Sequence, residues 1–446
     1  MIGGRQTIRW LLRHGLLRYS VRRTARTDDL LPALMFDPVV VANPYPHYDR
    51  LRARGRLVEH GMVLNTAHHD LVLAALRSPH LGIVEGAAAR APVTLRMLQR
   101  AGGTGPLSAV EPPSMLAVDG ADHSRYRRLV TRSFSARAVA GLRGRVQRIA
   151  DELLDGMAAA ADGEPVDLVA HYASLLPATV IAEMLGAPLR MRRQFLAWGA
   201  GGARLIDPGL TLRHYAAAEN DLAAMQRWMV DHLELLRREP GDNILSALVH
   251  ERAEGGLTQD ELVSIALLLL AAGFETTVNL IGNAVALLTA HPEQLALLRA
   301  EPHRWPHAVD EVLRFDPPVQ RTGRVTLQDT VLAGEPVPGG RFVLLQLAGA
   351  NRDPAVFAQP HRFDITRPDA ADHLAFSSGP HYCLGAGLAR LEGEVGLRAL
   401  FERFPGLTLA GRPQRRPTRV LRGFAAMPVR LGVRPDAGRA AGSPSG

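Results

Sequence analysis

The single cysteine of the chain, Cys383, lies in the segment FSSGPHYCLG, which spans residues 376–385. A helix is predicted directly after this segment, and a helix N-terminus stabilises a thiolate through its dipole and its unpaired amide N–H groups. Gly379 and Gly385 would let the backbone lie close to a planar ring and aim N–H groups at the sulfur, which tunes a metal–thiolate bond, while Phe376 would shield that side. The alternative is a glycine-rich turn around a buried structural cysteine. One cysteine excludes an intramolecular disulfide and a zinc or iron–sulfur site built from cysteines alone.

Residues 271–277, AAGFETT, place a glycine, an acid and two hydroxyls in the middle of an apolar predicted helix. A glycine such as Gly273 costs about 0.8–1 kcal/mol in a helix interior. Local rules broken in mid-helix without an evident structural gain point to a functional site, here Glu275 and Thr276. The alternative is that the threonine hydroxyl bonds to a carbonyl of its own helix and is inert.

Charged side chains recur at helical spacing in two other places. Glu311 and Arg314 are three residues apart, and His123 and Arg127 are four apart, so each pair shares one helix face. Taken alone, the first pair is typical of a surface ion pair worth under about 1 kcal/mol, and the second is typical of a solvated basic face. His381 could pair with an anionic substituent of a cofactor.

The elements that would position these residues are mostly helices, because apolar residues recur every three or four positions through most of the first 350 residues. The strongest predicted helix spans 257–289, where Thr258 and Glu261 form a capping box ahead of an apolar stretch. The remaining expected elements are a hairpin at 56–65 followed by a helix to about 76, a long loop at 82–113, short strands after 315, a helix at 384–403 and a hairpin-like tail from 408. We predict a mainly α fold with small sheets, organised as a basic N-terminal extension (1–30), a single catalytic domain (31–435) and a disordered tail (436–446).

Composition narrows the class of protein further. The 446-residue chain has a net charge of +8, and all of its basic residues other than histidine are arginine. These arginines are scattered, which is not typical of a nucleic-acid-binding patch, so no nucleic-acid partner is expected. The N-terminus is basic, and Arg13 interrupts its apolar residues. The unbroken apolar stretch is therefore too short for a signal peptide or a membrane span. We expect a helix capping the globule, with a peripheral membrane contact as the alternative, and a monomeric cytoplasmic protein.

The 376–385 segment resembles the haem-binding loop of cytochromes P450, Phe-Gly-x-Gly-x-(His/Arg)-x-Cys-x-Gly. One departure is Ser377, which stands where the family usually has glycine. Other family elements follow in order, and the runs AAGFETTVNL, NRDPAVF and RVLRG look most like mycobacterial P450 family 140. The resemblance covers about residues 37–430 and implies the P450 fold, with haem b between the long helix and the cysteine loop.

The resemblance also assigns roles to individual residues. Cys383 would be the iron ligand, and Glu311 and Arg314 would form a buried structural network with Arg362 of the Pro-x-Arg-Phe segment. Glu275 would relay protons, and Thr276 would hydrogen-bond O2 and a water. The residues implied to bind the cofactor are His123, Arg127, Ala272, Gly273, Arg324, Phe376, Gly379, His381, Cys383 and Gly385; His123, Arg127, Arg324 and His381 would bind the propionates.

The activity implied is monooxygenation of a small hydrophobic substrate, with electrons from an external ferredoxin and ferredoxin reductase. Substrate would reach the site between the 82–113 loop and the 190–215 segment. The candidate lining residues are Leu268, Ala272, Val319, Thr322 and Phe424. Three alternatives remain open: a peroxide-driven peroxygenase, which usually lacks the acid–alcohol pair, a haem sensor, which would not need that pair, and a haem-free binding module, which would be expected to have lost Cys383.

Overall fold

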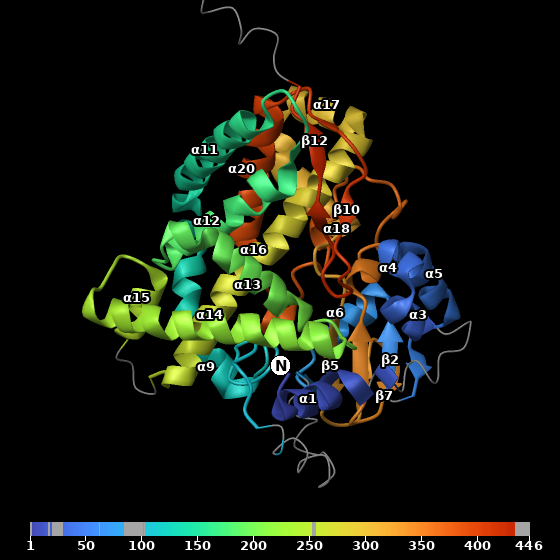
Figure 1. Cartoon of the computed structure of the whole chain (residues 1–446). Coiled ribbons are helices and arrows are strands. Elements are labelled where there is room, and N and C mark those ends of the chain that lie inside the picture. Colours follow the sequence, from blue (N-terminus) through green and yellow to red (C-terminus); the bar gives the residue numbers. More distant parts are fainter. Residues whose placement is uncertain are drawn as a thin grey trace, which may run out of the picture.

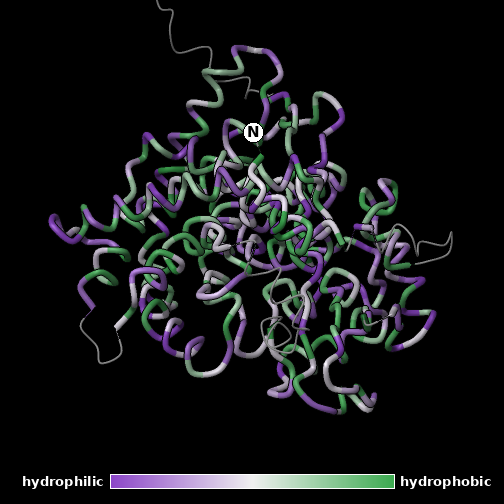
Figure 2. The backbone as a smooth tube through the Cα atoms, turned by 60° about the horizontal axis from the view of Figure 1, so that its bottom comes forward, coloured by the Kyte–Doolittle hydropathy of each residue, from purple (hydrophilic) through white to green (hydrophobic). Residues whose placement is uncertain are grey.

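The computed structural model describes residues 2–16, 18–19, 30–61, 63–83, 101, 103–251 and 256–432. Helices make up most of this part of the chain, and a small mixed sheet lies at one side of them, near α3, α5 and α6 (Figure 1). Hydrophobic and hydrophilic positions alternate along the tube throughout the molecule (Figure 2), as expected where each helix turns one face to the core. The predicted tail at 436–446 and residues 84–100 of the predicted 82–113 loop lie outside the described residues.

The helix α16 (Gln259–Ala290) runs through the core and organises the helical part of the fold. It begins with the predicted capping box, in which Thr258 and Glu261 each bond to the other's backbone. Its apolar stretch is long enough to cross a membrane, but 78% of that stretch is buried inside the protein, as in the core helix of a globular domain. The predicted helix at 257–289 is therefore confirmed.

The helices that pack on α16 include α12 (Leu175–Met184), α13 (Arg192–Arg204), α14 (Leu212–Arg238), α18 (Trp305–Phe315) and α20 (Ala386–Arg403). The contact with α13 is close because Gly199 faces the ring of Phe274 on α16. A Cβ at position 199 would lie 2.1 Å from Phe274 Cζ, so only glycine allows this approach.

The five-stranded sheet has the order β1-β2-β8-β5-β3. The predicted hairpin is present as β1 (Val58–His60) and β2 (Val63–Thr66), which pair antiparallel. Strand β2 continues parallel to β8 (Phe342–Leu345), and β8 pairs antiparallel with β5 (Thr322–Thr326), which carries Arg324. Strand β3 (Leu81–Gly82) completes the sheet after α6 (His69–Arg77).

Smaller strand groups lie outside the five-stranded sheet. The tail predicted to alternate like a hairpin forms β9 (Thr408–Leu409), β10 (Gln414–Arg415), β11 (Phe424–Ala426) and β12 (Pro428–Arg430). Strands β10 and β11 pair antiparallel, and β12 lies between β9 and β4 (Val166–Asp167). The last pair is β6 (Thr330–Leu332) with β7 (Glu335–Val337).

The remaining helices surround this framework. The described part of the predicted 1–30 extension contains α1 (Gly4–Trp10) and a π-helical turn (Leu11–Gly15), and α1 packs on α14 (Leu212–Arg238). The others are α3 (Leu30–Phe36), α4 (Pro38–Ala42), α5 (Tyr45–Arg54), α9 (Gly120–Thr131), α10 (Ala136–Gly141), α11 (Arg143–Ala161), α15 (Ile244–Val249), α17 (Pro292–Ala300) and α19 (Leu347–Ala350).

Candidate active site

The loop that carries Cys383 is held in one conformation by its own backbone. The N–H group of Cys383 donates to the carbonyl of Phe376 at 2.9 Å, and the next helix, α20, begins three residues after the cysteine. Gly379 has a φ of +68°, and a Cβ there would lie 2.5 Å from the carbonyl oxygen of Leu76 on α6. Glycine at 379 is thus required by the backbone angle and by the space.

The Cys383 sulfur has protein atoms on most sides, and its side chain remains partly accessible to solvent. Burial raises the pKa of the Cys383 thiol, while the N–H of Gly385 and the charges of Arg127 and Arg390 act in the opposite direction. A thiol with a raised pKa keeps its proton at neutral pH until a metal cation displaces it, because a coordinating thiol is deprotonated.

A small accessible face interrupts the otherwise buried middle of α16. From residue 262 to residue 285 every residue is buried except Ala271, Ala272, Gly273 and Thr276. Residues three and four apart share one helix face, so Ala272, Gly273 and Thr276 open a window in the wall of the core, with Ala271 next to it in the chain. The segment that was predicted to be functional is therefore the segment that the core leaves uncovered.

Both threonine hydroxyls of this segment bond to their own helix. Thr276 Oγ1 donates to the carbonyl of Ala272 at 3.0 Å, and Thr277 Oγ1 donates to that of Gly273 at 3.3 Å. The back-bonded conformation weighed as the inert alternative is thus present in this structure. The two positions still differ, because Thr277 is buried and Thr276 belongs to the accessible face.

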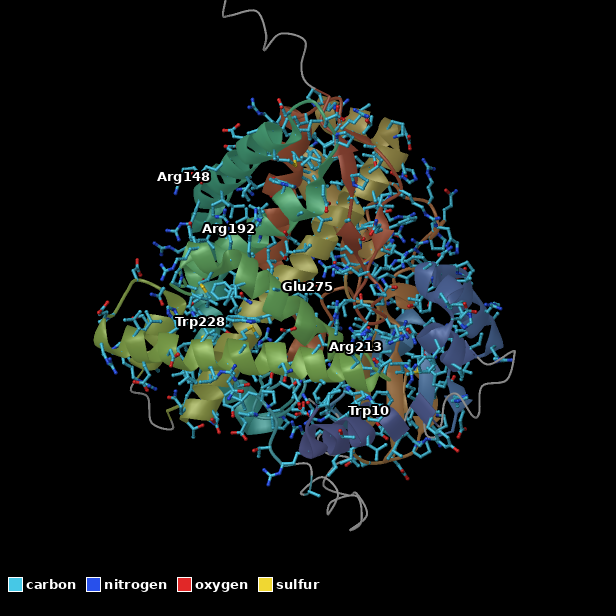
Figure 3. All side chains as sticks on the ribbon, viewed as in Figure 1. Trp10, Arg148, Arg192, Arg213, Trp228 and Glu275 are labelled. Atoms are coloured by element: carbon cyan, nitrogen blue, oxygen red, sulfur yellow. The ribbon has the colours of Figure 1, made fainter. Side chains whose placement is uncertain are left out.

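Glu275 is buried and binds a partner from the C-terminal part of the chain. Its Oε1 lies 2.6 Å from Arg416 Nη1, and Arg416 also donates to the carbonyl of Phe424. Burial raises the pKa of Glu275, and the charges of Arg416 and Arg204 oppose that rise. Glu275 lies near the centre of the molecule (Figure 3), so its protons must come through neighbouring groups.

Cationic and imidazole groups gather beside the cysteine loop. The rings of His123 and His381 are 4.1 Å apart, and His381 Nε2 lies 2.9 Å from a carboxylate oxygen of Asp119. Burial lowers the pKa of His123 to about 4, with the charges of His381 and Arg127 adding to the effect. Arg324 is buried, and within the described part of the chain no carboxylate oxygen lies within 4.0 Å of its guanidinium. A buried guanidinium with an imidazole pair nearby suits a ligand that brings its own carboxylates.

One carboxylate ties α9, which carries His123, to the start of α16. Glu261 Oε1 accepts from Arg125 at 2.6 Å and from the hydroxyl of Tyr126 at 2.7 Å. Its Oε2 accepts from the N–H of Thr258 at 2.8 Å in the capping box. The hydrogen bond from Arg125 is the main cause that lowers the pKa of Glu261 to about 2.

The Glu311–Arg314 pair is fully buried and linked by two hydrogen bonds, of 2.6 and 2.8 Å. The prediction that the side chain of Arg362 is the third member is wrong, because that side chain is 62% exposed. Arg362 contributes its backbone carbonyl to Arg314 instead. The third charge is Arg367, whose Nε lies 3.6 Å from Glu311 Oε2 and whose side chain is 7% exposed.

The structure also brings in residues that the sequence did not single out. Asp119, Arg367 and Arg416 each act through a partner far away in the chain, and nothing in their local pattern separates them from neighbouring charges. Glu392 on α20 is 1% exposed, and one of its carboxylate oxygens has no hydrogen-bond partner in the structure. Burial raises its pKa to about 8. In the sequence, the signal that could have singled out Glu392 is an acid at an otherwise apolar position of a helix.

The donor set fits a haem group. Cys383 is an accessible thiol in a loop whose backbone is fixed, and the accessible face of α16 consists of small residues and one hydroxyl. Buried Arg324 and the His123–His381 pair supply the electropositive side that two carboxylate substituents need.

Comparisons with known proteins agree with this geometry. The family model for cytochrome P450 matches residues 204–431. A putative cytochrome P450 140 of Mycobacterium tuberculosis is 45% identical over 432 residues, covering 95% of this chain and 97% of that protein. A 6-deoxyerythronolide B hydroxylase of Saccharopolyspora erythraea is 43% identical over 318 residues, covering 70% of this chain and 76% of that protein. The crystal structure of ligand-free Mycobacterium smegmatis CYP164A2 is similar with a TM-score of 0.80 and 34% identity, covering 90% of this chain and 99% of that one.

The chain belongs to the cytochrome P450 family and is a P450 enzyme. The predicted P450 fold and the predicted resemblance to family 140 are confirmed. Membership of this family implies a haem cofactor.

Proposed function

We propose that the protein is a haem-thiolate monooxygenase that oxidises a hydrophobic organic substrate with O2. The observation that carries this proposal is the accessible window on α16, formed by Ala272, Gly273 and Thr276, together with the accessible thiol of Cys383. Haem b, when bound, would supply the activation of O2, so that one oxygen atom enters the substrate and the other leaves as water.

The side chains around the cofactor would divide its binding among them. Cys383 would give its proton up and ligate the iron as a thiolate, and the N–H of Gly385 would tune the charge on the sulfur. His123, Arg127, Arg324 and His381 would bind the two propionates, which supplies Arg324 with the counter-charge that it needs in the interior. Phe376 and Gly379 would shape the loop against the ring.

Proton delivery would use the two polar residues in the middle of α16. Thr276 would exchange its bond to the Ala272 carbonyl for bonds to O2 and a water, which is a rotation about one side-chain torsion. Glu275 would pass protons to that water, and its raised pKa brings it closer to neutral pH, where an acid–base group works best. Glu275 would have to leave Arg416 to do so.

The iron ligand is tested by spectroscopy. Reduced protein under carbon monoxide should show the far-red-shifted Soret band of a thiolate-ligated haem. Cys383→His, which offers iron an imidazole, should lose that band if it binds haem at all. A histidine-type band in folded wild-type protein would overturn the proposal. Faster product formation with hydrogen peroxide alone than with O2 and electrons would also overturn it and would favour a peroxygenase.

The substrate class is proposed to be hydrophobic, such as a lipid, a sterol or a polyketide-like molecule. Of the candidate lining residues, Leu268 and Phe424 are buried, and Val319 and Thr322 are partly exposed. The name of the 6-deoxyerythronolide B hydroxylase supports a large apolar substrate. A screen for compounds that shift the iron from low to high spin tests this, and a response confined to small polar compounds would contradict it.

External ferredoxin and its reductase are proposed as the electron donors. We predict an acidic ferredoxin that docks on arginines near the Cys383 face. Arg390 is engaged by Asp310 at 2.7 Å, so exposed Arg132 is the better candidate. Reduction by the ferredoxin should slow as salt rises, and more so in wild type than in Arg132→Ala. A monomeric cytoplasmic protein, with peripheral membrane contact of the N-terminus as the alternative, stays a prediction for light scattering and cell fractionation.

A further inference from the structure

The first described residues of the chain lie across the start of α14 and are fixed there by polar contacts. We call residues 3–16 and 18 the N-terminal strap. Arg9 forms two hydrogen bonds with the carboxylate of Glu219, at 2.7 and 2.8 Å, and the two side chains are only 14% and 5% exposed. Gln6 donates to the carbonyl of Ala216, and Arg13 donates to the hydroxyl of Tyr215. Figure 3 shows Trp10 of the strap beneath the part of α14 where Arg213 lies.

The strap also holds two connecting segments. Trp10 Nε1 donates to the carbonyl of Leu210 at 2.8 Å, and Arg18 donates to that of Gly209, so the link between α13 and α14 is fixed from below. On the other side, Arg13 forms an ion pair with Glu111. The backbone at Gly105 lies against the Arg9–Glu219 pair, because a Cβ there would be 3.3 Å from atoms of both side chains.

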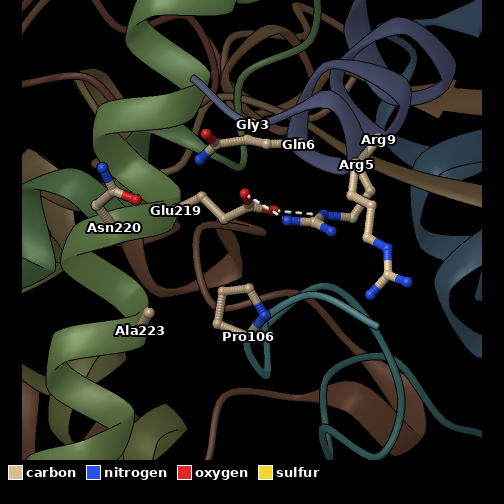
Figure 4. Close-up of a pocket in the computed structure, with 8 residues that line it drawn as sticks. All are labelled: Gly3, Arg5, Gln6, Arg9, Pro106, Glu219, Asn220 and Ala223. Atoms are coloured by element: carbon tan, nitrogen blue, oxygen red, sulfur yellow. Dashed lines mark hydrogen bonds and ion pairs between the residues drawn. The ribbon is translucent and has the colours of Figure 1, made fainter. Parts of the chain in front are cut away.

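The strap turns polar as well as apolar groups toward the rest of the protein. Leu11 and Leu16 are 41% and 49% exposed, whereas Arg9 and His14 face α14. Ion pairs and hydrogen bonds therefore contribute to its attachment, together with the half-buried side chains of Ile8, Trp10 and Leu12. A shallow hollow of about 360 Å³ lies between strap, α14 and Pro106, with the Arg9–Glu219 pair at its wall (Figure 4).

The segments under the strap are connected to the reaction helix. Buried Asp207, in the link between α13 and α14, accepts from the backbone N–H groups of Arg419 and Val420. The same C-terminal loop carries Arg416, which binds Glu275 on α16. The strap thus joins the 103–111 segment to the 207–219 segment, and the second of these is bonded to the C-terminal loop that carries Arg416.

From these contacts we propose that the Arg9–Glu219 ion pair is a latch that selects ligands by size. With the latch closed, the strap holds the 103–111 and 207–219 segments together, and a bulky molecule reaches or leaves the site only when the pair opens. A small molecule passes without opening. This inference rests on the proposed haem site, since the site at the end of the path is the one described above.

The test is stopped-flow binding of two iron ligands, 4-phenylimidazole as the bulky probe and carbon monoxide as the small one. Arg9→Ala should raise both the association and the dissociation rate of 4-phenylimidazole by at least tenfold, with the dissociation constant changed by less than about twofold, because a gate changes the barrier and not the end states. Carbon monoxide binding to the reduced protein should keep its wild-type rate.

Three variants separate a latch from general damage. The charge-swapped Arg9→Glu/Glu219→Arg protein should return toward the wild-type rates. Arg143→Ala, which removes a two-bond ion pair with Glu394 elsewhere on the surface, should leave both probes unaffected. If Arg9→Ala does not fold, Trp10→Phe, which removes only the bond to Leu210, should give a smaller increase for the bulky probe alone.

The outcomes distinguish this inference from the proposed function. Suppose that Arg9→Ala shows the thiolate-type carbon monoxide band but binds 4-phenylimidazole at the wild-type rates. That result would overturn the latch and leave the proposed haem site unaffected. If Arg9→Ala does not fold, the same result in Trp10→Phe has the same meaning. Equal acceleration of both probes would also overturn it, because size selection would be absent. Loss of the thiolate-type band in wild type would overturn the proposed function itself.

Discussion

Arg367 Nε lies 3.6 Å from Glu311 Oε2, inside the protein, while the side chain of Arg362 five residues earlier is on the surface. Glu311→Ala should therefore leave the buried charges of Arg314 and Arg367 without a counter-charge, at a cost of about 3–5 kcal/mol in the free energy of unfolding. Arg367→Ala should destabilise less, since Glu311 keeps Arg314, and Arg362→Ala should be close to neutral. Melting temperature and haem content check this order, and equal effects of the two arginine variants would contradict it.

Thr276→Ala isolates the hydroxyl on the accessible face of α16. The variant should bind haem, substrate and O2 and accept electrons at a similar rate, because none of these steps uses the hydroxyl. Reducing equivalents should escape as hydrogen peroxide, so that product per reduced nicotinamide falls. Thr277→Ala is the matched control, since its hydroxyl is buried and bonded to Gly273. Equal coupling in wild type and Thr276→Ala would show that the back-bonded hydroxyl is only structural.

Glu392 makes the stability of the protein depend on pH. Burial raises its pKa from an ordinary 4.5 to about 8. Between these two values the folded protein keeps the proton and the unfolded chain releases it, so the contribution to stability is fully present below pH 4.5 and is lost as pH rises toward 8. The slope is up to about 1.4 kcal/mol per pH unit. Glu392→Gln should remove this slope and melt higher than wild type at pH 8, and a parallel pH dependence in the two proteins would refute it.

Ser377 occupies a backbone conformation that favours glycine. Its φ is +64°, and its buried hydroxyl has no hydrogen-bond partner in the structure. A side chain in the left-handed region costs about 1–2 kcal/mol, so Ser377→Gly should raise the melting temperature by about 1–2 °C without changing the spectrum of the haem. Ser377→Ala, which keeps the strain and removes only the hydroxyl, is the control. A lower melting temperature for the glycine variant would show that the serine has a role of its own.

The sequence predicts best where the signal is local. The apolar period and the Thr258–Glu261 capping box place α16 to within two residues at its start, and alternation around Gly61 places the β1–β2 hairpin. The accessible face at 271–276 was also foreseeable, because local helix rules are broken there. Each of these features depends on residues within a few positions of one another.

The sequence predicts worst where two distant residues must meet. No local pattern indicates that Arg367, and not Arg362, is the partner of Glu311. The two arginines lie in the same irregular segment, and the direction of the chain there decides which side chain is buried. The Glu275–Arg416 pair joins residues 141 positions apart. Long-range pairing of this kind follows from the packing of the whole fold, and single-residue propensities carry no information about it.

Glu261 also limits how this protein can change over generations. Its two oxygens serve the Thr258 cap, the Arg125 guanidinium and the Tyr126 hydroxyl at once. Glutamine would keep acceptor length but lose the charge that Arg125 needs, and aspartate would be one methylene too short for the reciprocal cap. Most substitutions at this position would therefore remove the side chain that links α9 to α16. We expect related proteins to keep an acid at position 261 even where their substrate-facing residues differ.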